Sequence, residues 1–256
     1  MPDDAAVGTE DVKVSVENRI LKIVIDRPAK KNALTGAMYM AMAHALEGAA
    51  DDGEVRAVVL TGNGDFFTSG NDLKDFLSHG TGDGEERPAF RFMSALMELD
   101  KPVIAAVNGP GIGIGTTMLL HCDFAYAAPD AYLHMPFVDL AVVPEFGSSL
   151  TVPALVGRAR ASELLLLGEK MSAERAVADG FVNAVVDDPL ERAMEVAHRL
   201  AAKAPGALRR AKALMRRPVE DAPARILAEG EIFSDQLASP EARETMQAFL
   251  EKRRPD

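Results

Sequence analysis

The chain has 256 residues, of which 48% are hydrophobic and 26% are charged. These values are ordinary for a globular protein and exclude a wholly disordered chain. The 39 acidic and 28 basic side chains give a net charge of −11, which argues against nucleic acid as the main partner. This balance still allows a small anionic ligand held by a local basic patch.

Cysteine content and apolar runs indicate the cellular compartment and limit the kinds of bound metal or membrane contact to expect. A single cysteine, Cys122, excludes an internal disulfide, and no cysteine–histidine spacing indicates a metal site. The longest apolar stretch, residues 103–120, is interrupted by proline, asparagine and glycine and does not suit a membrane span. The acidic N-terminus lacks the features of a signal peptide. We therefore expect a cytoplasmic protein with no metal and no membrane partner.

Strand and helix signals alternate from residue 12 to about residue 187. Two strands come first, followed by a helix that Thr35 caps and that carries an apolar stripe. Strands are expected at 12–16, 20–26, 56–61, 102–108, 123–127, 131–133 and 181–186. Helices are expected from 35 to 50, from about Glu85, and at 114–121, 158–167, 172–179 and 189–202.

This alternation predicts an α/β fold with a helical C-terminal segment, because only helical patterns follow Pro205. A strand–helix rhythm recurs along residues 12–121, although the repeats share no sequence identity. We divide the chain into a disordered tail at 1–10, a core at 11–202 and a helical segment at 203–256.

Two glycine-containing loops follow buried strands at matching points of this rhythm. The first spans residues 66–73, and the second spans residues 108–115 and opens a helix. Peptide N–H groups at a helix N-terminus point outward and attract negative charge. Two such loops, if they converge, place two N–H groups on one oxygen and form an oxyanion hole. Spacing alone leaves open the alternative of two tight turns in which glycine avoids clashes.

Four segments resemble, in order and spacing, the crotonase (enoyl-CoA hydratase/isomerase) superfamily. They are residues 26–34 with Asp26-Arg27-Pro28, residues 67–73, residues 101–109 and Cys122-Asp123. The resemblance covers residues 10–254 and implies a spiral of ββα units that assembles as a homotrimer or hexamer. It also implies an acyl-CoA thioester as ligand and no cofactor, because CoA is part of the substrate.

The same resemblance implies roles for individual residues. The thioester oxygen would lie between the N–H groups of Ser69 and Ile114, and Gly113 and Phe137 would line the substrate pocket. Ala29 and Lys30 would approach the CoA phosphates. The adenine and pantetheine path would follow the backbone of Ser69, Gly70, Asn71, Asp72 and Leu73.

The reaction depends on where carboxylates stand. Hydratases of the superfamily use two glutamates around a water, but this chain has Thr117 and Phe137 at those positions. Residues 143–149 instead resemble the Δ3,Δ2-enoyl-CoA isomerase branch, which implies that Glu145 is the single base. A dry pocket would raise the pKa of this glutamate. A glutamate that merely starts a helix after Pro144 is the structural alternative.

Two other functions remain open alongside an isomerase. One is an enoyl-CoA hydratase or another crotonase reaction, and the other is an acyl-CoA-binding module without turnover. A hydratase needs a second acid, for which Asp139 is the only nearby suggestion.

We assign structural roles to the remaining side chains that could take part in catalysis or binding. We expect packing and turn roles for His121, Cys122, Asp123 and His134, and backbone hydrogen bonds from Ser148 and Ser149. The methionines at 38, 40, 42, 93 and 97 are expected in the core. The basic residues from Lys203 to Arg217 are either a solvated helix face or a patch that attracts CoA phosphates.

Overall fold

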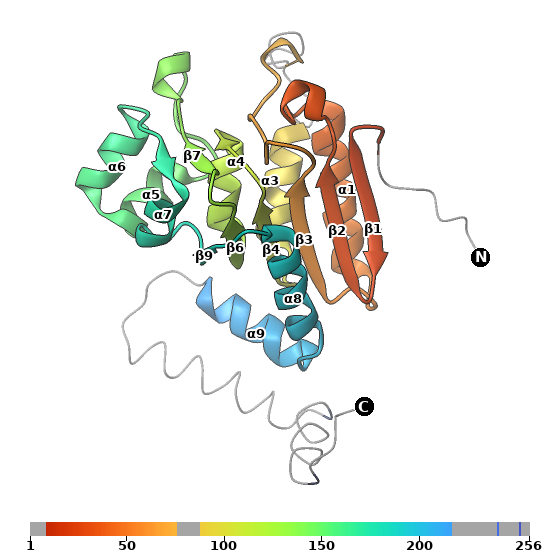
Figure 1. The fold of residues 1–256 in the computed structure, drawn as a ribbon. Helices are drawn as coiled ribbons and strands as arrows, with labels where there is room; N and C mark the ends of the chain where they lie inside the picture. Colours follow the sequence, from red (N-terminus) through yellow and green to blue (C-terminus); the bar gives the residue numbers. More distant parts are fainter. Residues whose placement is uncertain (1–8, 76–87, 217–239, 241–250, 252–256) are drawn as a thin grey trace.

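A computed structural model describes residues 9–75, 88–216, 240 and 251 (Figure 1). Its main sheet has the strand order β1-β2-β3-β4-β6-β9. β1 and β2 are antiparallel, and the neighbouring pairs from β2 to β9 are parallel. The strands are β1 (Val12–Glu17), β2 (Ile20–Ile25), β3 (Ala57–Gly62), β4 (Val103–Val107), β6 (Phe124–Ala127) and β9 (Ala184–Val185).

Both faces of this sheet are buried, which explains why β3 and β4 are continuous apolar runs. On one face, α1 (Gly36–Asp51) and α3 (Pro88–Glu98) pack over side chains such as Val58 and Leu60. On the other face, α8 (Pro189–Ala201) covers Val59 and its neighbours (Figure 1). The predicted cap is confirmed, since the Thr35 hydroxyl accepts a hydrogen bond from the Met38 N–H.

A second layer of short extended segments runs beside the main sheet. β5 (Gly111–Ile112), β7 (Tyr132–His134) and β8 (Met171–Ser172) form a small sheet in that order. Isolated bridges join Leu34 to Asn71 and Thr68 to Gly111. Each repeat of the spiral therefore contributes one strand to the main sheet and one short extended segment to this layer. The strand–helix rhythm that the sequence indicated is confirmed, and so is the repeat of ββα units that the resemblance implied.

Several elements differ from the sequence-based expectation. The helix predicted at 114–121 divides into α4 (Ile114–Thr117) and the 3-10 turn η2 (Met118–His121). The strand predicted at 181–186 shrinks to β9. The predicted helix start near Glu85 falls outside the described residues. Within them, α3 starts at Pro88. A helix after Pro144, which the sequence suggested only as the alternative role of Glu145, is present as α5 (Ser148–Val156). It contains Pro153, a residue that ordinarily argues against a helix interior.

The remaining elements of the described residues are two short turns and three helices. They are the 3-10 turns η1 (Pro28–Lys30) and η3 (Val138–Leu140) and the helices α6 (Arg158–Leu165), α7 (Ala173–Ala178) and α9 (Pro205–Met215). No helix in the described ranges is long and apolar enough to cross a membrane. The expectations for residues 1–8 and for most of residues 217–256 fall outside the described part of the chain.

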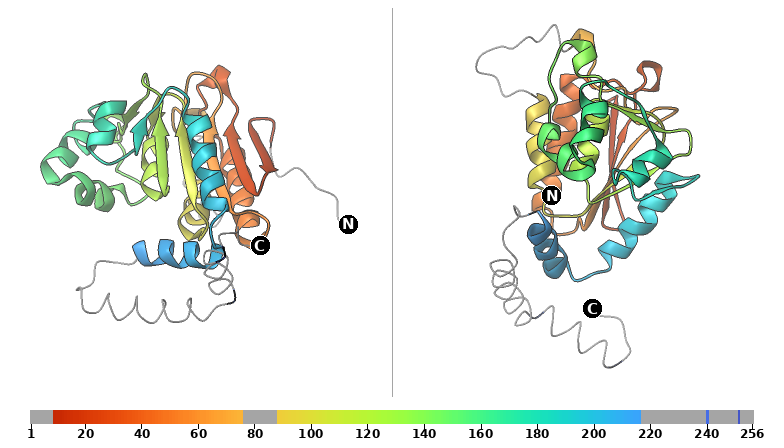
Figure 2. Two further views of the ribbon diagram at one scale, coloured as in Figure 1. Left: turned by 60° about the horizontal axis from the view of Figure 1, so that its bottom comes forward. Right: turned by 90° about the vertical axis from the view of Figure 1, so that its left-hand side faces the viewer.

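Helix α9 crosses the end of the sheet at which the parallel strands begin (Figures 1 and 2). Its Lys212 is buried, donates to Asp123 at 2.7 Å and also donates to the Lys101 carbonyl. Arg216 donates to the carbonyls of Leu99 and His121. Lys212 and Arg216 thus attach α9 to the core, so neither interpretation of the basic stretch holds for these two residues.

We predict that Lys212→Met lowers the free energy of unfolding by about 1–3 kcal/mol. The Lys101 carbonyl loses the Lys212 donor, and Asp123 keeps the Val103 N–H but loses its closest cationic partner. Urea denaturation followed by circular dichroism measures the change. Lys203→Met removes an exposed lysine nearby and is the matched control. Equal effects of the two substitutions would contradict the anchoring role of Lys212.

Candidate active site

The two glycine-containing loops lie in direct backbone contact. The Thr68 N–H donates to the Pro110 carbonyl at 3.2 Å, and the Ile112 N–H donates to the Thr68 carbonyl at 2.9 Å. Gly70 has a φ of +86°, and a Cβ there would lie 2.9 Å from the Ile112 carbonyl oxygen. Only glycine permits both this backbone angle and this approach. The convergence that the sequence suggested is confirmed.

The amides of the 66–73 loop are used unequally. The Ser69 N–H donates to the Lys31 carbonyl at 3.0 Å, and the Asp72 N–H donates to the Leu34 carbonyl at 2.8 Å. The Ser69 amide is therefore engaged, and the prediction that it donates to a substrate oxygen is wrong. For the Asn71 N–H, which lies between them, the described residues supply no acceptor.

The 108–115 loop also presents an amide without an acceptor. Gly113 has φ and ψ of 57° and −118° and directly precedes α4. The N–H groups of Thr116 and Thr117 both return to the Gly113 carbonyl, at 2.9 and 3.0 Å. Ile114 is the first residue of α4, and no acceptor for its N–H is found among residues 9–75 and 88–216. Such a first-turn amide is suited to bind a negatively charged oxygen.

Glu145 supplies the carboxyl group of the site. Its Oε1 accepts a hydrogen bond of 2.6 Å from the fully buried Thr117 hydroxyl, and Thr117 belongs to α4, the helix that Ile114 opens. Burial raises the pKa of Glu145 above its ordinary value, and the Thr117 hydrogen bond opposes part of that rise. Thr117 thus holds the Glu145 carboxyl against α4, the helix that begins with the Ile114 amide. The carboxyl is partly removed from solvent there.

A tight turn fixes the backbone at Glu145. The Ser148 hydroxyl donates to the Glu145 carbonyl at 2.6 Å, as the sequence suggested for this serine. Phe146 stacks on His121 with 4.0 Å between ring centroids, and the Phe146 carbonyl lies 2.8 Å from His121 Nε2. Because α5 begins only at Ser148, Glu145 lies ahead of the helix, and its side chain faces Thr117.

Tyr39 joins the two sides of the site and was missed by sequence reasoning. Its hydroxyl donates to Asn71 Oδ1 at 2.5 Å. The ring is buried in α1, and both burial and the charge of nearby Glu145 raise the pKa of Tyr39 well above its ordinary value. The apolar stripe of α1 gave no hint of this contact, since Tyr39 lies between the stripe residues Met38 and Ala41 in the sequence.

The residues predicted to contact the CoA portion lie around the 66–73 loop. Ala29 and Lys30 are exposed in η1, one residue before Lys31, whose carbonyl binds the Ser69 amide. Asp72 pairs with Arg27 at 2.7 Å, and this contact lowers the pKa of Asp72. Leu73 is exposed, Phe137 is buried, and Gly113 adjoins Ile114.

The structural roles predicted for other side chains are mostly confirmed. His134 Nε2 lies 2.8 Å from the Gly168 carbonyl, and Cys122 donates to Met118, with burial raising the pKa of Cys122 to about 12. Within the described ranges, no group of three or more metal-binding side chains is present. Of the methionines expected in the core, Met38 and Met42 are buried there and Met93 packs against it, but Met40 is only partly buried outside the core and Met97 is exposed.

Comparison with known proteins places this geometry in a family. The family described as enoyl-CoA hydratase/isomerase matches residues 15–256. Human enoyl-CoA delta isomerase 2 is 39% identical over 224 residues, which is 84% of this chain but only 56% of that protein. The 2,3-dehydroadipyl-CoA hydratase of Escherichia coli K12 is 35% identical over 95% of this chain and 96% of its own length.

A solved structure agrees with these matches. The enoyl-CoA hydratase/isomerase of Pseudoalteromonas atlantica T6c superposes with a TM-score of 0.78 and 42% sequence identity, covering 96% of this chain and 99% of that chain. The chain therefore belongs to the enoyl-CoA hydratase/isomerase family and has the crotonase fold.

Proposed function

We propose that the protein is an enoyl-CoA isomerase that converts a 3-enoyl-CoA to the conjugated 2-enoyl-CoA. The observation that carries this proposal is the position of Glu145, a half-buried carboxyl that accepts from Thr117 beside the Ile114 amide. An isomerisation of this kind requires one base and a stabilised enolate, and the site supplies a group for each task.

In the proposed mechanism, the thioester oxygen accepts hydrogen bonds from the N–H groups of Asn71 and Ile114. Glu145 removes a proton from C2, and the electron pair moves through the thioester to give a dienolate whose negative charge the two amides stabilise. The same carboxyl returns the proton at C4, so the double bond moves with no net gain or loss of atoms. No metal or redox cofactor takes part in this scheme.

The surroundings of Glu145 suit transfer of a proton rather than addition of water. Thr117 and Phe137, which replace the two hydratase glutamates, are both buried, and neither is a carboxylate. Asp139, the suggested second acid, is exposed in η3. The raised pKa of Glu145 brings it closer to neutrality, where a group exchanges protons most effectively.

The principal alternative is hydration or another crotonase reaction, which the similarity to the Escherichia coli hydratase favours. That similarity is 35%, against 39% for the human isomerase, and such values do not separate the two reactions. A hydratase would have to use a second acid other than the residues at positions 117 and 137. A module that binds acyl-CoA without turnover is the non-enzymatic alternative.

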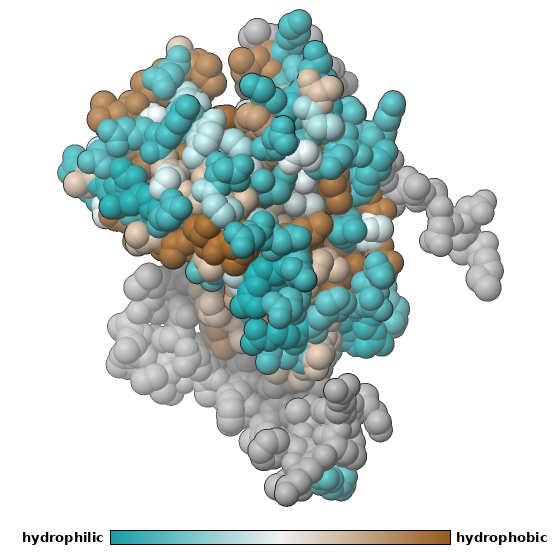
Figure 3. All heavy atoms as spheres, viewed as in Figure 1, coloured by the Kyte–Doolittle hydropathy of each residue, from teal (hydrophilic) through white to brown (hydrophobic). Residues whose placement is uncertain are grey.

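We propose a cytoplasmic homotrimer, alone or paired into a hexamer. Support comes from large apolar side chains left exposed around η3, α5 and α6, of which some are visible as brown atoms at the upper left of Figure 3. Exposed apolar patches of this kind are typical of interfaces. The residues are Val138, Leu140, Val142, Val143, Leu150, Leu166 and Leu167.

We predict that Glu145→Gln lowers kcat for a 3-enoyl-CoA by about 10²–10⁴-fold, because the amide cannot take the C2 proton. The growth of conjugated-thioester absorbance measures turnover, and a parallel assay follows loss of a trans-2-enoyl-CoA. Acyl-CoA affinity should change little, because the change is isosteric. Fast hydration of the 2-enoyl substrate that survives Glu145→Gln would contradict the proposal, and binding without either reaction would favour a non-catalytic module.

A second prediction concerns the pH profile. Thr117→Val removes the hydrogen bond that stabilises the ionised form of Glu145, so the pKa of Glu145 rises further. Because the base must be ionised, the acid limb of kcat/KM moves to higher pH, and activity is lost at pH values where the unsubstituted protein still works. Ser149→Ala, at an exposed position, is the control. An unchanged acid limb would contradict Glu145 as the base.

A further inference from the structure

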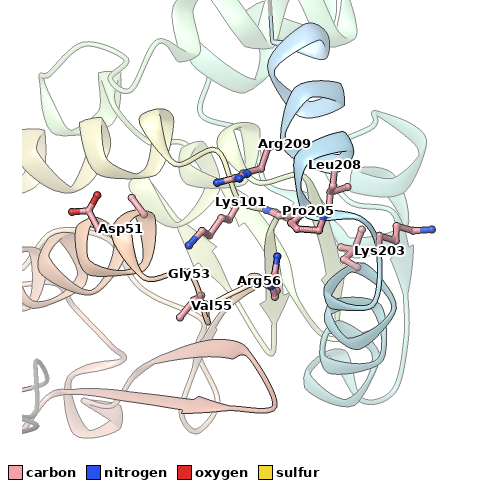
Figure 4. A pocket seen from close by; sticks show the side chains of 12 residues that line it. Asp51, Gly53, Val55, Arg56, Lys101, Lys203, Pro205, Leu208 and Arg209 are labelled. Atoms are coloured by element: carbon pink, nitrogen blue, oxygen red, sulfur yellow. The ribbon is translucent and has the colours of Figure 1, made fainter. Parts of the chain in front are cut away.

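A basic pocket lies at the opposite edge of the main sheet from Glu145. It has a volume of about 260 Å³ and lies where β3 and β4 begin, between the end of α1 and the junction of α8 with α9 (Figure 4). The site described above occupies the loops that follow these same parallel strands. The two sites are therefore separated by the length of the sheet, and acyl-CoA at one does not occupy the other.

The lining of this pocket is unusual for an acidic protein. Four cationic side chains and one carboxylate line it, in a chain whose net charge is −11. The cations are Arg56, Lys101, Lys203 and Arg209, and the carboxylate is Asp51. The lining therefore carries a local surplus of positive charge, which Asp52 and Asp100 beside Lys101 partly offset. No local sequence pattern indicates that residues 56 and 101 meet the basic stretch after 203.

Arg56 is the cation of this pocket that has a hydrogen-bond donor left unsatisfied by the described residues. Its Nε is buried, and no hydrogen-bond partner for it exists among the described residues. A buried polar atom without a partner is costly, so the Arg56 guanidinium carries at least one donor that no described protein acceptor satisfies. A guanidinium also presents its donors as a planar fork that matches the oxygens of a phosphate.

Lys101 and Arg209 also belong to the cationic wall of the pocket, and they differ in how firmly the protein holds them. The Lys101 ammonium is fixed by the carbonyls of Ala49 and Asp52, and burial together with the charges of Arg56 and Arg209 lowers the pKa of Lys101. Nearby Asp100 and Asp52 act in the opposite direction on that pKa. Among the described residues, Arg209 pairs loosely with Asp100, at 3.6 Å between half-exposed side chains.

The two remaining contributions come from the α8–α9 junction. The lysine at 203 extends away from the other three cations in Figure 4, so it belongs to the rim rather than to the wall. Helix α9 begins at the pocket with Pro205 and has no acidic residue in its first turn and no capping side chain. Its positive dipole end therefore adds to the field of the arginines.

We propose that this pocket binds the phosphate group of a small ligand through Arg56 and Arg209, at a site separate from the acyl-CoA site. A phosphate dianion matches the surplus of positive charge better than a single carboxylate does. This inference does not rest on the proposed isomerase activity, because none of the pocket residues belongs to the candidate active site.

The test is isothermal titration calorimetry of the full-length protein with inorganic phosphate, at constant ionic strength. Sodium acetate serves as the monoanionic comparison. We expect saturable phosphate binding that is weaker for acetate, and a loss of affinity of about tenfold or more in Arg56→Gln and in Arg209→Gln, since each removes a charge-assisted hydrogen bond. Lys203→Gln removes the same charge from the rim and should weaken binding by less.

Arg209 is exposed, so Arg209→Gln keeps the test valid if Arg56→Gln disturbs folding, which circular dichroism reports. The absence of saturable phosphate binding would overturn the proposal. So would phosphate binding that persists in Arg209→Gln, because the anion would then sit elsewhere, for example near Lys30. Equal weakening by Lys203→Gln and Arg209→Gln would also overturn it, as that result indicates a diffuse field without a site.

Discussion

The candidate site depends on how closely two stretches of backbone approach each other. Where residues 68–70 meet residues 110–113, two peptide hydrogen bonds join the loops, and a side chain at position 70 would collide with the Ile112 carbonyl. A similar limit holds at Gly115, where a Cβ would lie 2.6 Å from Thr68 Cγ2. This contact uses some of the loop amides, and among the described residues those of Asn71 and Ile114 have no acceptor. The chemistry proposed for the protein uses what this contact leaves unpaired.

The two edges of the main sheet have different tasks. At the carboxyl edge, loops lead away from the strands and leave amides and one carboxyl for a ligand, as open parallel sheets commonly do. At the amino edge, buried cations hold helices in place, with Lys101 on the end of α1 and Lys212 on Asp123. Arg56 is the exception at this edge, because its Nε has no protein partner in the described ranges.

Sequence reasoning reached the parts of the site that local pattern determines. The strands, the Thr35 cap and the two loops follow from apolar periodicity and glycine, and the resemblance drew attention to Glu145. The choice between neighbouring amides was beyond it, because the engagement of Ser69 depends on Lys31, which is 38 residues away and whose carbonyl direction no pattern encodes. Tyr39 was missed for the same reason, since its partner Asn71 is 32 residues away.

The central claim is that one carboxyl and two peptide amides surround the reacting atoms. A crystal structure with an unreactive acyl-CoA analogue tests it most directly. We expect a thioester oxygen about 2.7–3.1 Å from the N–H nitrogens of both Asn71 and Ile114, with the Glu145 carboxyl over C2 to C4 of the acyl chain. A thioester oxygen bound by the Ser69 amide instead, or a Glu145 carboxyl turned away from the chain, would contradict it.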